Sequence, residues 1–182
     1  MAANKLRDEL VILRCQAREE SAFKQLVERW EPSLYYYLRR IARSESDVWD
    51  ILQETWLAVF QSIRRLQDPR KFRSWLYKLA RNQASNWLRR EQRHDHVQNG
   101  DIDDRSELTN EFPFASERAQ LVHGLLEGLR LPYREVITLY FLEEFSIKEI
   151  AEIIGVPDGT VKSRLHYAKK ELREALEKMN GG

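Results

Sequence analysis

The sequence has little of the three residue types that most constrain a backbone: cysteine, glycine and proline. Among 182 residues there are 7 glycines, 5 prolines and a single cysteine, Cys15. One cysteine excludes a disulfide within the chain, which suits a reducing compartment. We expect Cys15 to be a small, partly buried helix residue. Because so few residues interrupt helices, long uninterrupted helices are possible.

Long hydrophobic runs are also missing, and the charges nearly cancel. The first residues contain no apolar stretch of signal-peptide length, and no run approaches the roughly 18 apolar residues of a transmembrane helix. We therefore expect a cytoplasmic chain without membrane insertion. The net charge is +1 although 32% of residues are charged. A nucleic-acid-binding surface would thus have to come from local clustering of basic residues.

The usual motifs of catalytic sites are absent as well. The chain has no phosphate-binding glycine loop, no nucleophile elbow, and no Cys-x-x-Cys or His-Glu-x-x-His pattern. A metal-dependent enzyme could use His94, Asp95 and His96, but their spacing does not place them on one helix face. Incidental polar residues are the better interpretation. We expect no catalytic residue, no metal and no cofactor, and hence a protein that is not an enzyme.

What the sequence does contain is helical periodicity, which predicts an all-α protein of two small domains. Residues 5–94 form the first domain, which begins with Leu6, Leu10 and Leu13. Its clearest apolar stripe is Val48, Ile51, Leu52, Thr55, Trp56, Val59, Phe60 and Ile63. A second stripe is Phe72, Trp75, Leu76, Leu79, Ala80, Gln83 and Trp87. Residues 116–179 form the second domain, with a stripe of Tyr133, Val136, Ile137, Tyr140 and Phe141.

Residues 95–115 between them are predicted to be a flexible acidic linker. Within 95–111 there are six acids and one base, Arg105. About twenty extended residues can span roughly 66 Å, so the two domains could occupy separate sites on DNA.

The strongest motif is a helix-turn-helix in the second domain. Ser146 and Glu149 form a capping box that opens a helix, and Gly155 suits its C-terminal cap. A second helix follows from Asp158, with Val161, Leu165, Ala168, Leu172 and Leu176 predicted to face inward. Its outer face is basic, and such a helix places its first residues at base edges in the major groove. The candidate DNA-binding residues are Thr160, Lys162, Ser163, Arg164, His166, Tyr167 and Lys170. The alternative is a solvated basic face on an ordinary helical hairpin.

Two further clusters lie in the first domain. Residues 64–94 hold ten bases and two acids, a pattern typical of a helix that follows a phosphate backbone. The candidates there are Lys71, Arg73, Trp75, Lys78, Arg81, Asn82, Arg89 and Arg90. We expect Trp75 and Trp87 to serve mainly the core. Asp50, Gln53, Glu54 and Leu57 lie opposite the core stripe of their helix and suggest a docking surface for a protein, unless that face is only solvated.

At these residues the chain closely resembles the extracytoplasmic-function (ECF) group of bacterial RNA polymerase sigma factors, in the sigma-70 superfamily. The matching blocks are Asp47-Val-Trp-Asp-Ile-Leu-Gln-Glu-Thr-Trp-Leu57, Phe72-Arg-Ser-Trp-Leu-Tyr-Lys-Leu-Ala-Arg-Asn-Gln-Ala84 with Leu88-Arg-Arg90, and Ser146 to Lys170. They occur in the family's order and cover nearly all of the chain except the linker. Trp49 departs from the family, which usually has a small or acidic residue there.

The resemblance implies a fold and a set of roles. The first domain would be a sigma region 2 bundle and the second a sigma region 4 helix-turn-helix. The face with Asp50 and Leu57 would dock on the clamp of the largest polymerase subunit, and the flap of the second-largest subunit would be a further contact. Residues 70–90 would melt and read the −10 element, with Asn82 at a pocket for a flipped-out base and loop 67–71 setting the preference. The helix from Asp158 would read the −35 element. Family members are often held by an anti-sigma factor, which is a possible partner here.

The main alternative is an ordinary helix-turn-helix regulator that binds a palindromic operator as a dimer. Such a regulator would not associate with core polymerase, whereas a sigma factor would do so and would cover an asymmetric site. The basic stretch at 70–93 argues against the sensing domain that a regulator would carry there.

Overall fold

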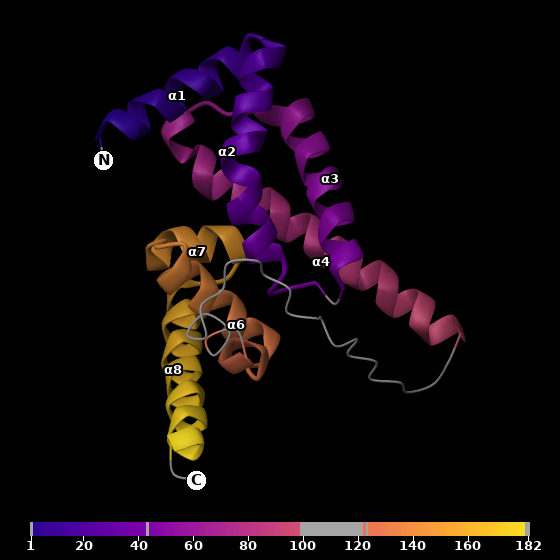
Figure 1. Cartoon of the computed structure of the whole chain (residues 1–182), viewed down its shortest axis with the longest axis vertical. Coiled ribbons are helices and arrows are strands. Elements are labelled where there is room, and N and C mark those ends of the chain that lie inside the picture. The colour runs from indigo at the N-terminus through magenta and orange to yellow at the C-terminus, as the bar shows by residue number, and fades with distance from the viewer. Residues whose placement is uncertain (1, 43, 99–121, 123, 181–182) are drawn as a thin grey trace. The chain divides into compact units, whose positions relative to one another are not determined.

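The structure, a computed structural model, describes residues 2–42, 44–98, 122 and 124–180, with no account of the side chains of 2–5, 91–98 and 180. Within these ranges every regular element is a helix, as the periodicity predicts. The chain divides into two compact units, Met1–Asp104 and Arg105–Gly182, which are described separately (Figure 1). No helix among the described residues is long and apolar enough to cross a membrane.

In its described residues, the first unit has four α-helices and two short 3₁₀ turns. The helices are α1 (Ala2–Gln16), α2 (Glu20–Leu38), α3 (Glu45–Ser62) and α4 (Phe72–Gln98), and the turns are η1 (Ile63–Arg65) and η2 (Pro69–Lys71). Figure 1 shows α4 crossing behind α2 and α3, both of which it contacts. At the centre Tyr37 of α2 and Tyr77 of α4 are fully buried, with ring centroids 5.2 Å apart. Val48, Ile51, Leu52 and Val59 bury the inner side of α3.

Helix α3 begins with a capping box that the sequence pattern did not reveal. The Ser44 hydroxyl accepts from the Asp47 amide at 3.2 Å, and the Asp47 carboxylate accepts from the Ser44 amide at 3.0 Å. The helix therefore starts at Glu45, directly after its cap, Ser44. The signal was present, but with Asp in place of the usual Glu or Gln three residues after the cap.

Helix α4 continues through Gln98, which is four residues into the segment predicted as a linker. The remainder of that segment, and residues 116–121 of the predicted second domain, lie outside the described residues. The domain limits of 5–94 and 116–179 therefore stay predictions.

The second unit contains α6 (Leu131–Ile137), a π-helical turn η3 (Thr138–Leu142), α7 (Ile147–Ile154) and α8 (Asp158–Asn180). Pro132 occupies the first turn of α6, where its missing amide hydrogen costs no helical hydrogen bond. Part of the predicted stripe is wrong. The wider π-helical turn places the residues that follow on other sides of the helix than a regular α-helix would. Thr138 and Leu139 are fully buried, whereas Phe141 is 51% exposed.

Other apolar residues that the stripes assigned to the core also lie at the surface. Leu6, Leu10 and Leu13 are more than half exposed, because α1 packs through Ile12 and Cys15 instead. That burial raises the pKa of the Cys15 thiol to about 11. Phe60 is 63% exposed, and its ring meets only the edge of the core at Phe23, with centroids 5.4 Å apart. Leu176 is also exposed, near the end of α8. Each helix has apolar residues on more than one side, and the packing partner decides which side is covered.

The turn between α7 and α8 generates a stability prediction. Gly155 has a φ of 69° and a ψ of 40°, a left-handed conformation that costs residues with a Cβ about 1–2 kcal/mol. A Cβ there would meet no atom within 4 Å, and the same is true of Gly159 within α8. Gly155→Ala should therefore destabilise the second unit by about 1 kcal/mol through the backbone alone, whereas Gly159→Ala should leave it unchanged or slightly more stable. Hydrogen exchange of the α7 and α8 amides measures both effects, and equal shifts would contradict the prediction.

Candidate nucleic-acid and partner interfaces

The helix-turn-helix forms as its sequence predicts. In the capping box of α7 the Glu149 carboxylate accepts from the Ser146 amide at 2.9 Å, and the Ser146 hydroxyl accepts from the Glu149 amide at 3.3 Å. Gly155 ends α7, and α8 begins three residues later, at Asp158. Helices α7 and α8 contact each other, and the buried residues that they contribute are Ile150, Ala151, Ile153, Ile154, Val161, Leu165 and Ala168. This packing leaves the opposite side of α8 facing water.

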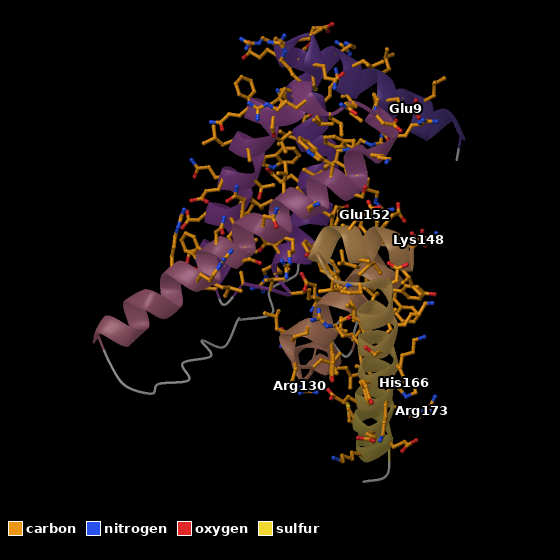
Figure 2. All side chains as sticks on the ribbon, turned by 180° about the vertical axis from the view of Figure 1, so that it is seen from behind. Glu9, Arg130, Lys148, Glu152, His166 and Arg173 are labelled. Carbon is orange, nitrogen blue, oxygen red and sulfur yellow. The ribbon has the colours of Figure 1, made fainter. Side chains whose placement is uncertain are left out.

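The outer face of α8 brings most of its candidate residues together. Exposed on it are Lys162, Ser163, His166, Tyr167 and Lys170, while Thr160 and Arg164 are half-buried. Figure 2 labels two residues of α8, His166 and Arg173, and Arg173 lies about two turns after His166. The Tyr167 ring stacks on Tyr133 of α6, with centroids 6.4 Å apart. One aromatic ring of this face is therefore supported from behind by a second helix.

Lys169 does not join that face. Its ammonium lies 5.3 Å from the centre of the Phe141 ring and 5.7 Å from that of Tyr140, both in the π turn. The structure thus separates Lys169 from the candidate DNA-binding residues of this helix. The cation also covers the aromatic rings that the π turn exposes.

The basic face of α4 forms a second candidate surface. Lys71, Lys78, Asn82, Arg89 and Arg90 are exposed, and Arg73, Trp75 and Arg81 are half-buried. Trp75 packs against Phe72, with ring centroids 5.9 Å apart, which agrees with the expectation that it serves the core. Arg89 donates to the Asn86 side chain at 2.9 Å. Asn86, which the sequence analysis did not single out, therefore orients one of the candidate bases.

Loop 67–71 precedes this face and is held by its own aspartate. The Asp68 side chain accepts from the Arg70 backbone amide at 3.0 Å and from the Arg70 guanidinium at 3.0 and 3.1 Å. These hydrogen bonds from Arg70 lower the pKa of the half-buried Asp68 carboxyl. Asp68 therefore stays ionised at neutral pH and partly offsets the basic charge of the loop.

The outer face of α3 carries the residues predicted to dock a partner protein. Asp50, Gln53 and Leu57 are exposed, Leu57 by 56%, and Glu54 is half-buried. The structure adds two aromatic residues to this surface, Trp49 and Phe60, which are 50% and 63% exposed. The apolar stripe of this helix predicts Phe60 in the core, although its spacing of three from Leu57 also fits the outer face.

Trp49 has a defined position on this face. Its ring lies against Tyr35 of α2, with centroids 5.0 Å apart, and the Tyr35 hydroxyl donates to Glu45 at 2.8 Å. Burial, and then the hydrogen bond to Glu45, raise the pKa of Tyr35, so this donor keeps its proton. The residue at which this chain differs from the family, Trp49, is therefore an ordered aromatic side chain. It lies one helical turn before Gln53.

One ion pair links the two candidate surfaces of the first unit. The Arg90 guanidinium on α4 lies 3.2 Å from the Glu54 carboxylate on α3, and the two side chains are 60% and 40% exposed. A candidate DNA-binding residue is thus paired with a candidate partner-binding residue. A ligand on either surface would compete for this contact.

The side chains that the structure describes include no group of three His, Cys, Asp or Glu residues able to hold a metal ion. The side chains of His94, Asp95 and His96 lie outside those described.

Comparison with known proteins matches the two units to two separate family profiles. Residues 26–94 match the family profile of sigma-70 region 2, and residues 119–172 match that of sigma-70 region 4. An ECF RNA polymerase sigma-E factor of Haemophilus influenzae is 29% identical, over 96% of this chain and 98% of its own length. The ECF sigma factor SigW of Bacillus subtilis is 28% identical, over 87% of this chain and 90% of its own.

Among solved structures, a sigma factor RpoE in complex with the anti-sigma factor NepR, from Bartonella quintana, is similar in fold. The TM-score is 0.76 at 24% identity, over 85% of this chain and 96% of that one.

The Arg90–Glu54 contact leads to a second prediction. Because both side chains are largely exposed, the pair should stabilise the first unit by less than about 1 kcal/mol and should weaken in high salt. A double-mutant cycle with Glu54→Gln and Arg90→Gln, followed by urea unfolding, measures the coupling free energy. The same cycle with Arg89→Gln is the control, because Arg89 bonds to Asn86 instead. A coupling above about 2 kcal/mol would mean that the pair is desolvated and not readily available to a ligand.

Proposed function

Since the chain belongs to the extracytoplasmic-function group of the sigma-70 family of RNA polymerase sigma factors, we propose that it directs transcription initiation by reading a −10 and a −35 element. The observation that carries this proposal is the pairing of two basic outer helix faces, on α4 and α8, in two separate units. A protein that only binds an operator has no use for the first of them. The chain would act as a non-catalytic subunit, in the cytoplasm where chromosomal DNA and polymerase lie.

We propose that the outer face of α3 docks on the clamp of the largest polymerase subunit. Leu57, Trp49 and Phe60 supply exposed apolar area, and Asp50, Gln53 and Glu54 surround it with polar groups. An apolar centre with a polar rim is the usual arrangement of a specific protein interface. Trp49 suits the centre, because Tyr35 already holds its ring and little side-chain freedom is lost on binding. The second unit would contact the flap of the second-largest subunit.

The basic face of α4 would capture the melted −10 strand. Arg81 follows Lys78 by three residues and Arg89 follows Arg81 by eight on the same helix, a spacing that lets them follow a single phosphate backbone. Extruding a base from the stack costs a few kcal/mol, which contacts to the extruded base must offset. Asn82, exposed between Lys78 and Arg89, can donate to and accept from such a base.

The first turns of α8 would read the −35 element in the major groove. Lys162 and Arg164 are suited to guanine edges and phosphates, and Ser163 can serve either. Ser163 donates to the Thr160 carbonyl at 3.0 Å, which leaves the lone pairs of its hydroxyl oxygen for a base donor. With a net charge of +1, the isolated chain should bind DNA weakly and depend on the polymerase for a stable complex.

A regulatory partner also fits this assignment. The Bartonella quintana relative in fold was solved as a sigma factor with an anti-sigma factor. We propose that this chain is likewise held by an anti-sigma factor until a signal releases it.

Binding to core polymerase tests the proposal directly. The full chain should co-purify with core RNA polymerase and support run-off transcription from a promoter library. Leu57→Asp should weaken the complex at least about tenfold, since it places a charge in the apolar centre of the docking face. Gln25→Asp, at an exposed position of α2 outside this face, is the control and should have little effect. If the chain ignores core polymerase and instead binds a palindrome as a dimer, it is an operator-binding regulator.

Two substitutions separate base reading from phosphate binding. Arg164→Ala should relax the −35 preference by about 1–3 kcal/mol at one base position. Lys78→Ala should weaken binding to all promoters alike and reduce the salt dependence by nearly one unit of slope. Run-off transcription on promoters with altered −35 bases, across a series of salt concentrations, measures both. Equal effects of the two changes on every promoter would contradict this division of roles.

A further inference from the structure

One side chain of α1 holds the segment that leads into loop 67–71. Gln16, the last residue of α1, donates from Nε2 to the carbonyl oxygens of Ile63 and Leu66, at 3.0 and 2.7 Å. These carbonyls belong to the two ends of the turn that closes η1, because the Leu66 amide also donates to Ile63 at 3.1 Å. A single amide group thus ties the end of η1 to a helix 47 to 50 residues earlier in the chain.

Gln16 projects from a helix that is itself well anchored. Ile12 and Cys15, in the same last turns of α1, are 1% and 5% exposed. Nearer the start of α1, Asp8 pairs with Arg29 of α2 at 2.7 Å. The donor therefore has a defined position relative to the core.

The two ends of the loop are held by different groups. Gln16 holds the upstream side at Leu66, and Asp68 holds the downstream side by accepting from the Arg70 amide and guanidinium. Gln67, between the two anchors, is exposed. Fixing both sides of such a short segment leaves few conformations to Gln67 and to the exposed bases that follow.

A charged residue of α1 also interacts with this loop. The pKa of Arg70 is raised, chiefly by the hydrogen bond and the charge of Asp68, and to a smaller extent by Glu9 of α1. Glu9 lies two turns before Gln16 on the same helix, and Figure 2 labels its side chain. A charge and a hydrogen-bond donor from α1 therefore act on the same few residues.

We propose that Gln16 is a positioning residue for loop 67–71 and that α1 thereby takes part in promoter selection. The proposal rests on the function given above, in which this loop sets the −10 preference. A loop that reads a base discriminates well only when its conformation is set before binding, because ordering the loop otherwise consumes binding free energy for every sequence alike. Removing the Gln16 donor should therefore flatten the −10 preference and leave the −35 preference unchanged.

The test uses the full chain with core RNA polymerase on a promoter library randomised at both elements, with sequencing of the transcripts. Gln16→Leu removes the amide donor and keeps the approximate size of the side chain. Gln16→Glu also removes the donor and keeps both the size and the shape. Gln25→Leu, at an exposed position of α2, removes the same group elsewhere in the unit and is the matched control. We expect both Gln16 variants to lower the ratio between the best and the worst −10 sequence by about fivefold, the factor that one modest base contact supplies. The −35 ratio and the Gln25 variant should match the wild type.

Each other result has a defined meaning. An unchanged −10 ratio in the Gln16 variants overturns the positioning role and leaves the proposed function intact. A parallel fall at both elements, or failure of both Gln16 variants to assemble while the control assembles, shows that Gln16 maintains the fold and also overturns it. A wild-type chain without preference at either element contradicts the proposed function itself.

Discussion

The contact between Tyr37 and Tyr77, two fully buried rings 5.2 Å apart, determines which way α4 faces. A helix that carries charge on one side can present it only if its rotation is fixed, and burial of the opposite side fixes the rotation. With Tyr77 turned inward beneath α2, Lys78, Asn82 and Arg89 face water. In the second unit the buried residues Val161, Leu165 and Ala168 do the same for α8. Both proposed DNA-binding faces therefore depend on the core behind them.

This arrangement explains how a nearly neutral chain can bind nucleic acid. Residues 72–90 of α4 and 159–170 of α8 contain bases and no acid, while acids such as Asp50 occupy the outer face of α3. Each surface then carries a local charge whose sign suits its own ligand, although the net charge of the chain is close to zero. The Arg90–Glu54 pair is the place where the two kinds of surface meet within one unit. Because that pair is exposed and weak, it can open at small cost when polymerase or DNA arrives.

Much of the fold could be predicted because its signals are local. The capping box at Ser146, the glycine at position 155 and the spacing of Val161 and Leu165 each act within a few residues, and all are present in the structure. The outer faces of α3, α4 and α8 followed from the same periodicity. The separate roles of their residues came from the family resemblance and await the experiments above.

What could not be predicted depends on contacts between distant segments or on altered helix geometry. Periodicity assumes 3.6 residues per turn, so the π turn misplaced Phe141. It also cannot tell which side of a helix a neighbour covers, as Phe60 and the leucines of α1 show. The hydrogen bonds of Gln16 join positions about 50 residues apart, and nothing near Gln16 in the sequence indicates them.

The most direct test of the account is permanganate footprinting of a promoter with the chain and core polymerase together. Permanganate oxidises thymines that are no longer paired, so it reports strand opening base by base. The account predicts reactive thymines within one −10 element and protection of a separate −35 element, forming an asymmetric site that requires both core polymerase and this chain. A symmetric footprint from the chain alone, without reactive thymines, would contradict it.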